Sequence, residues 1–299
     1  MDNQTKVIQG DNEVLYKNQI NDIAFKKFKE ADYNLFFAIV SRAVDNIQKG
    51  NNQEIVLDYS TIKKLAGFTK HITNKDFWGK FLKPMVDKLI DCHCSFENDN
   101  EAHIFTIFTT FKADHKAAKL TVKVNEDFYY LLSDFDMSKG GFTKLELKRF
   151  VGLESKYTKT LYRNLRRFKA TGKYKIKADD LRELYDIPKT YKHSDIMKRV
   201  INPSIKELSK DFKNLKCETH KAAKQGAPID MYIFTFVPVP KTKKETDGQT
   251  DLLQAAEEMR KYKKQKAKEK NTFNNLETSP STPKTKDEWA DLEDKLLDN

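Results

Sequence analysis

The strongest constraint on how this 299-residue chain can fold is an internal repeat at an offset of 119 residues. Adding 119 to the apolar positions of one stretch gives apolar positions in a later stretch, without a gap over some 35 residues. The matched pairs are Ile55/Tyr174, Leu57/Ile176, Ile62/Leu181, Leu65/Leu184, Phe68/Ile187, Phe77/Ile196, Phe81/Val200, Leu82/Ile201, Pro84/Pro203, Val86/Ile205 and Leu89/Leu208. Self-similarity at a fixed offset is the sequence signature of a repeated structural unit. The chain is therefore predicted to contain the same unit twice.

The later copy shows what the unit is. Tyr174 and Ile176 alternate as in a strand, Asp179 or Asp180 is predicted to open a short helix, and Ser194 to cap a second helix after a turn at Pro188. A segment with the pattern of a β-hairpin follows the second helix in each copy, at 92–111 and at 216–236. Two helices joined by a tight turn and followed by a hairpin make a winged helix. The predicted fold class is α+β, with two tandem winged-helix domains from an internal duplication and a largely disordered C-terminal tail.

A proline recurs inside the second helix of both copies, at Pro84 and Pro203. Proline lacks the N–H that a helix interior requires, and it bends the helix around it. The two copies are therefore predicted to share a bend.

The second helix of the later copy has two different faces. At about 100° per residue, polar positions fall within one arc and apolar positions take the other side. The polar arc holds Asp195, Lys198, Arg199, Asn202 and Lys206, and the apolar side holds Ile196, Met197, Val200, Ile201, Ile205 and Leu208. In a helix-turn-helix this helix enters the DNA major groove. Taken alone, the pattern also fits an ordinary amphipathic surface helix.

The net charge of +11 is unevenly distributed. Residues 1–154 hold 22 basic and 22 acidic side chains, 155–240 hold 20 and 9, and 241–299 hold 13 of each. The corresponding reading positions of the first copy, Asp76, Gly79, Lys80, Lys83 and Asp87, are formally neutral, and the tip of its predicted wing, 97–101, carries three acids. Phosphate contact is therefore expected mainly from the second copy. The first copy is predicted to be mainly a protein-contact module, with secondary phosphate contacts at most.

The predicted domains are residues 1–137, 138–240 and 241–299. The first has a flexible N-terminus and an apolar helix from Ala31 to about Ile47, which either packs in the core or contacts a partner. A connection at 133–154 containing Gly140 and Gly141 is expected to give freedom between the domains, and Ser155 is predicted to begin the next helix. The tail is charged, with a possible docking helix at 287–298.

Several kinds of chemistry lack a sequence signal. The chain has no phosphate-binding G-x-x-x-x-G-K-[ST] motif and no paired histidines with a nucleophilic tyrosine. Cys92-His93-Cys94 has poor spacing for a metal site. We therefore expect no enzymatic activity, no metal and no cofactor. Three cysteines and the lack of a signal-like start favour a reducing cytoplasm, and no apolar run is long enough to span a membrane.

Several motifs agree with a known family. They are Phe142-Thr143, Leu153-Glu-Ser-Lys-Tyr157 with Leu161-Tyr162, Leu181-Arg-Glu-Leu184, Ile187-Pro188, Tyr191, and Lys198-Arg-Val-Ile-Asn-Pro203 with Ile205, Glu207 and Leu208. In these residues the chain resembles the initiator replication proteins of iteron-containing, theta-replicating bacterial plasmids. The resemblance covers roughly residues 15–240 and is strongest in the second domain.

This resemblance implies binding to directly repeated origin DNA (iterons) as a monomer, promotion of origin opening, recruitment of host replication proteins, and homodimerisation through the first domain. Two alternatives stay open: a winged-helix transcriptional repressor without initiator activity, and a structural partitioning adaptor. By physical role, Lys198, Arg199 and Asn202 are predicted to contact base edges. The predicted flanking and phosphate-contacting residues are Lys192, His193, Ser194, Lys206, Lys221 and Lys224.

Overall fold

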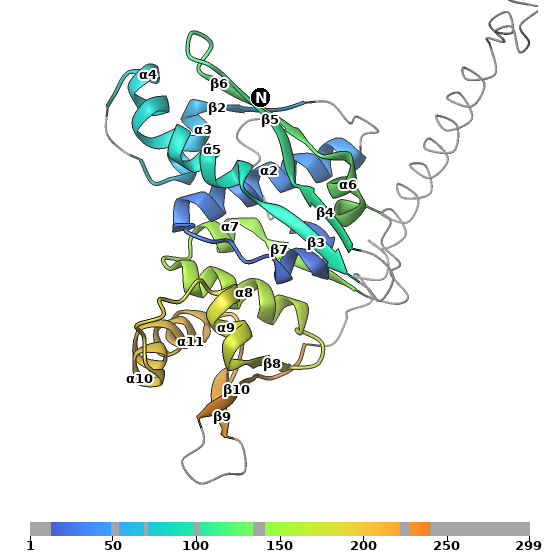
Figure 1. Cartoon of the computed structure of the whole chain (residues 1–299), viewed down its shortest axis with the longest axis vertical. Helices are drawn as coiled ribbons and strands as arrows, with labels where there is room; N and C mark the ends of the chain where they lie inside the picture. The colour runs from blue at the N-terminus through green and yellow to red at the C-terminus, as the bar shows by residue number, and fades with distance from the viewer. Residues whose placement is uncertain are drawn as a thin grey trace, which may run out of the picture. The chain divides into compact units, whose positions relative to one another are not determined.

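The computed structural model describes residues 13–48, 54–68, 71–97, 102–133, 141–221 and 228–239 (Figure 1). The predicted docking helix at 287–298, Lys224 and most of the acidic tip at 97–101 lie outside these ranges. Two winged-helix units of mixed helix and strand are present, as the repeat predicts.

The two copies match element by element. The first consists of β2 (Ile55–Asp58), α3 (Tyr59–Leu65), α4 (Asn74–Phe77), a π-helical turn η2 (Trp78–Leu82), α5 (Lys83–Ile90), β5 (Phe108–Asp114) and β6 (Lys119–Val124). The second consists of β8 (Lys173–Lys177), α9 (Ala178–Leu184), α10 (His193–Ile196), a π-helical turn η4 (Met197–Ile201), α11 (Asn202–Leu208), β9 (Lys216–Lys221) and β10 (Ile229–Thr235). The helices α3, α4 and η2 begin and end 119 residues before α9, α10 and η4. The duplication is therefore confirmed.

The prolines explain the π-helical turns. In the second copy the N–H of Asn202 bonds to the carbonyl of Met197, five residues back, and in the first copy Lys83 bonds to Trp78 in the same way. Pro203 and Pro84 follow directly and supply no N–H of their own. A turn with i→i+5 bonding accommodates the missing proline N–H within the helix, and such turns are frequent at functional sites. The predicted shared bend is thus present in both copies.

The wing of the first copy is not the hairpin that the sequence suggested. The second copy has a sheet in the order β8-β10-β9, and the first has the equivalent order β2-β6-β5. The first wing is therefore β5–β6, with its turn at 115–118, where Lys116 is exposed. The hairpin formed by β3 (His93–Glu97) and β4 (Ala102–Thr106) is an insertion that forms a separate two-stranded sheet. The acidic tip belongs to this insertion, so the prediction of an acidic first wing was wrong.

The N-terminal apolar helix is part of the core. Helix α2 (Glu30–Gln48) buries its whole apolar stripe: Leu35, Phe36, Ile39, Val40, Ala43, Val44 and Ile47. Phe25 and Phe36 meet edge to face at 4.7 Å, one contact within a larger aromatic cluster. Core packing was one of the two expectations for this stripe and is confirmed. Since the stripe is covered by the chain itself, it is no surface for self-association.

The predicted free connection between the copies is folded. Strand β7 (Phe142–Glu146) pairs antiparallel with β1 (Glu13–Lys17), and helix α7 (Leu147–Val151) follows it. Thr143 and Leu145 alternate as buried residues along β7, which is why this short segment forms a strand rather than a loop. The division at residue 138 stays a prediction, but β7 pairs with a strand on the N-terminal side of it.

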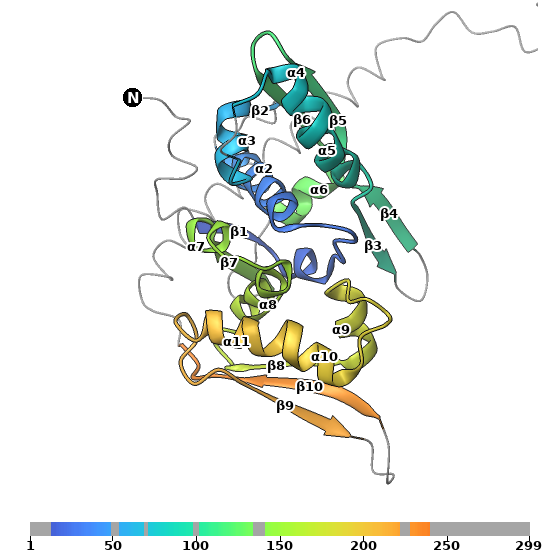
Figure 2. The same ribbon diagram turned by 90° about the vertical axis from the view of Figure 1, so that its left-hand side faces the viewer.

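Helix α8 (Lys156–Arg167) connects both halves, and Figure 2 shows it between β7 and the second copy. Ser155 caps it as predicted, accepting a hydrogen bond from the Tyr157 N–H at 3.2 Å. Two other predicted caps are wrong. Helix α9 begins at Ala178 after Lys177, which puts Asp179 and Asp180 inside its first turn, and α10 begins at His193 after Lys192 rather than after Ser194.

The remaining short elements lie in the N-terminal half. They are η1 (Asn18–Asp22), α6 (Glu126–Tyr129) and η3 (Tyr130–Leu132). No helix in the described ranges is long and apolar enough to cross a membrane.

Candidate nucleic-acid interface

The second helix of the later copy presents a polar face to solvent. We call residues 193–206 of α10, η4 and α11, together with the preceding Lys192, the reading helix of the second copy. Its exposed polar and charged side chains are Lys192, Ser194, Lys198, Arg199, Asn202 and Lys206. Ile196, Val200 and Ile201 are buried beneath them, while Met197 and Ile205 are only half-buried. The structure thus brings six of the nine predicted DNA-binding residues together on one exposed face.

Arg199 is held in place on this face. Its guanidinium carbon lies 5.2 Å from the centre of the Tyr191 ring, and its Nε lies 3.6 Å from Asp195 Oδ1. Tyr191 and Asp195 together raise the pKa of Arg199 above its usual range. Because 59% of the Arg199 side chain remains exposed, the guanidinium is oriented and still available to a ligand.

His193 has a structural contact that the sequence did not predict. It is half-buried, and its Nδ1 lies 2.9 Å from the hydroxyl of Tyr232 on β10. Burial, with a smaller effect from Lys221, lowers the pKa of His193 below its usual range. The neutral form of His193 therefore attaches the start of the reading helix to the wing. Lys221 lies exposed at the end of β9, the first strand of the β9–β10 wing.

The corresponding face of the first copy is neutralised by its own side chains. Lys80 pairs with Asp76 at 3.1 Å, and Lys83 pairs with Asp87 at 2.8 Å, each at i,i+4 spacing. In the second copy no ion pair of Lys198 or Lys206 occurs within the described residues, and Asn202 stands where the first copy has Lys83. The acidic hairpin tip is not part of the first wing. The difference in local charge expected from the sequence is nevertheless present on the helix itself.

Not all basic residues of the second copy face solvent. At least six of the 20 in residues 155–240 contact backbone carbonyls or acids within the fold: Lys156, Lys159, Arg163, Arg166, Arg167 and Arg182. Lys159 is fully buried, donates to the carbonyls of Phe150 and Val151, and has its pKa lowered by burial to about 7. The overall charge of the segment thus overstates the charge available to a partner.

Strand β8 carries a row of cations that was not predicted from the sequence. Lys173, Lys175 and Lys177 are exposed and alternate with the buried Tyr174 and Ile176. The alternation was visible in the sequence as a strand signal, but we used it only to place the strand. These lysines lie on an edge strand of the wing sheet, where lysine also discourages unwanted strand pairing.

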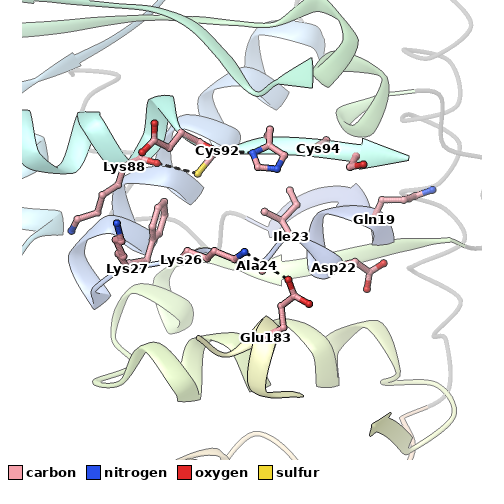
Figure 3. A pocket seen from close by; sticks show the side chains of 14 residues that line it. Gln19, Asp22, Ile23, Ala24, Lys26, Lys27, Lys88, Cys92, Cys94 and Glu183 are labelled. Atoms are coloured by element: carbon pink, nitrogen blue, oxygen red, sulfur yellow. Dashed lines mark hydrogen bonds and ion pairs between the residues drawn. The ribbon is translucent and has the colours of Figure 1, made fainter. Parts of the chain in front are cut away.

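A pocket of about 550 Å³, shown in Figure 3, is lined by residues outside the reading helix. Segment 19–28, the start of β3 and Glu183 of α9 line it, and Lys26 lies 3.7 Å from Glu183 across it. Burial raises the pKa of both the Cys92 and the Cys94 thiol to about 12, so neither is a ready thiolate. Within the ranges that the structure describes, no three His, Cys, Asp or Glu side chains are grouped to hold a metal ion.

Comparison with known proteins gives a consistent result. Residues 13–166 match the family described as "Initiator Replication protein, WH1", and residues 177–236 match "Initiator Rep protein, WH2". A "Probable replication protein rep" from Bifidobacterium longum (strain NCC 2705) is 28% identical over 225 residues, covering 75% of this chain and 72% of that protein. The solved structure described as "Crystal structure of Pi initiator protein in complex with iteron DNA" shares the fold, with a TM-score of 0.56 and 17% identity over 77% of this chain and 99% of that one. The chain therefore belongs to the initiator replication protein family, whose two winged-helix domains it carries in tandem.

Proposed function

We propose that this replication initiator binds directly repeated origin DNA as a monomer, with the reading helix of the second copy in the major groove. The proposal rests on the exposed side chains of Lys198, Arg199 and Asn202, which lie together on a helix bent by a π-helical turn. Arginine and lysine match the acceptors of guanine, and asparagine matches adenine. Lys192, Ser194, Lys206, Lys221 and Lys224 would fix the helix on phosphates. The solved Pi initiator, which has the same fold, is described in complex with iteron DNA.

We propose a different role for the first copy. Its ion-paired helix face makes secondary phosphate contacts at most, and the exposed Lys116 at the turn of the β5–β6 wing is one candidate for such a contact. We assign self-association to this copy, through the edge strand β4, where 65% of Ile104 is exposed. The protein would act by binding, opening the origin and recruiting host replication proteins in the cytoplasm, without catalysis.

A matched pair of full-length variants tests the assignment, because β1–β7 pairing and α8 make an isolated fragment from residue 138 a poor reagent. Arg199→Ala in the second copy corresponds to Lys80→Ala in the first. Titration of a duplex carrying the direct repeat found beside the gene should show a loss of about 1–3 kcal/mol for Arg199→Ala, at one base position above all. Lys80→Ala should bind within about twofold of the wild type. Equal losses from the two variants would contradict the proposal.

A further inference from the structure

The two copies differ at three positions that meet around the reading helix. The second copy has Arg182, Tyr191 and Arg199, and the offset of 119 places Lys63, Ile72 and Lys80 at the same positions of the first. In the first copy Lys63 lies over the Phe77 ring at 4.8 Å, and Lys80 pairs with its helical neighbour Asp76. Among the described residues, Arg199 of the second copy lies over an aromatic ring, whereas its counterpart Lys80 does not.

The backbone of Tyr191 is fixed on both sides. Its N–H donates to the carbonyl of Pro188 at 3.0 Å, and its own carbonyl accepts a hydrogen bond from Arg182 Nη2 at 2.9 Å. The backbone of Tyr191 is therefore held in place directly before the reading helix, which fixes the point and the direction from which its side chain leaves the chain.

Arg199 lies between this ring and a second anchor. Asp195 accepts the Lys192 N–H at 3.1 Å with one oxygen and faces Arg199 Nε at 3.6 Å with the other. A free arginine side chain samples many rotamers, whereas a guanidinium stacked on a ring presents its planar fork in a limited range of directions. Two-point contact with a guanine edge needs that restriction.

We propose that Tyr191 is a positioning residue, which holds Arg199 for reading one base and so sets sequence specificity at that base pair. The inference rests on the proposed DNA-binding function. It predicts an effect on which sequence is bound, beyond any effect on how tightly DNA is bound. Tyr191 itself need not touch the DNA.

The experiment compares base preferences of full-length proteins on a randomised duplex library, sequenced before and after selection. Arg199→Ala first identifies the base position that loses preference. Tyr191→Ile, which installs the residue of the first copy, should weaken preference at the same position and lower affinity about two- to fivefold, since an exposed cation–ring contact is of that size. Tyr191→Phe keeps the ring and should retain the wild-type profile. The double variant Tyr191→Ile/Arg199→Ala should match Arg199→Ala.

Thermal unfolding and the salt dependence of binding serve as controls, because a positioning role should leave both unchanged. Should Tyr191→Ile unfold, Tyr191→Leu provides the same test. If the isoleucine or leucine variant keeps the wild-type profile while Arg199→Ala loses one position, Tyr191 does not position Arg199, and the proposed function stands. If Arg199→Ala alters no position, both the inference and the base-reading part of the proposed function are wrong.

Discussion

Replacing Arg163 should be among the most damaging single substitutions in the described part of the chain. Arg163 lies on α8, is 0% exposed, and donates to the carbonyls of Ile20 at 2.7 Å and Ile23 at 2.8 Å. Its guanidinium carbon also lies 4.9 Å from the centre of the Phe25 ring. The side chain therefore connects the helix that begins the second half to the N-terminal segment of the first.

The magnitude follows from the groups that Arg163→Ala would leave behind. The Ile23 carbonyl would lose its Arg163 donor, at a cost of ~1–3 kcal/mol. The Ile20 carbonyl would keep the Ile23 N–H at 3.4 Å but lose a hydrogen bond to a charged group, worth roughly 1.5–3 kcal/mol. Loss of the ring contact adds roughly 0.5–1 kcal/mol. We expect the free energy of unfolding to fall by about 3–7 kcal/mol, a large part of the ~5–15 kcal/mol typical of a folded domain. Arg167→Ala is the matched control on the same helix. Its 2.8 Å ion pair with Asp22 is partly exposed, and its loss should cost at most about 1 kcal/mol.

Urea unfolding measures both variants. Far-ultraviolet circular dichroism reports the whole chain, and Trp78 fluorescence in a Trp289→Phe background reports the first copy. The free-energy change is obtained from the shift in midpoint and the slope m. A decrease below about 1 kcal/mol for Arg163→Ala, or one equal to that of Arg167→Ala, would refute the claim that α8 connects the two halves through Arg163.

Three further predictions concern the bend, the wing and self-association. Pro203→Ala should allow regular helical bonding and turn Arg199 relative to Asn202 by up to about 100°. This change should lower affinity for the repeat duplex at least tenfold. Pro84→Ala in the first copy is the control, and equal binding by both variants would contradict a role of the Pro203 bend in DNA binding. Because the pKa of His193 is lowered in the fold, the unfolded chain takes up this proton first, so stability is full above the unfolded pKa and falls as the pH drops through about 6.5. Unfolding midpoints from about pH 7 to pH 5 should fall less steeply in His193→Gln, and an unchanged slope would count against the buried neutral form. Ile104→Glu should weaken self-association of the full chain in sedimentation, whereas the exposed Val239→Glu should not; a wild-type constant for Ile104→Glu would remove β4 as the interface.

Most of the fold could be predicted from the internal repeat. Spacing alone placed β8, the reading helix and the shared proline bend, because apolar periodicity and a missing N–H are local properties. Predicted caps failed by one or two residues, since Asp179 or Ser194 can cap a helix or occupy its first turn equally well. The first wing was assigned to the wrong hairpin because the segment that directly follows α5 forms an antiparallel hairpin of its own, β3–β4. Only the pairing of β6 with β2 distinguishes the β5–β6 wing from this hairpin, and that pairing is set by tertiary packing.

The candidate site could be predicted in part for the same reason. The exposed face of the reading helix follows from helical periodicity, so Lys198, Arg199 and Asn202 were found. The buried role of Arg163 has no periodic signal, because its acceptors are backbone carbonyls from a segment some 140 residues away. Likewise, nothing in the sequence indicated that His193 would contact Tyr232 instead of facing a ligand.

We propose that the second copy, rather than the first, reads the DNA. The most direct measurement places a photo-crosslinking side chain at Asn202 or, in a second variant, at Lys83, the same position of the first copy. After irradiation with the repeat duplex, we expect a strong crosslink from position 202 to bases of the repeat and little or none from position 83. Equal crosslinking from the two positions, or crosslinking from position 83 alone, would contradict it.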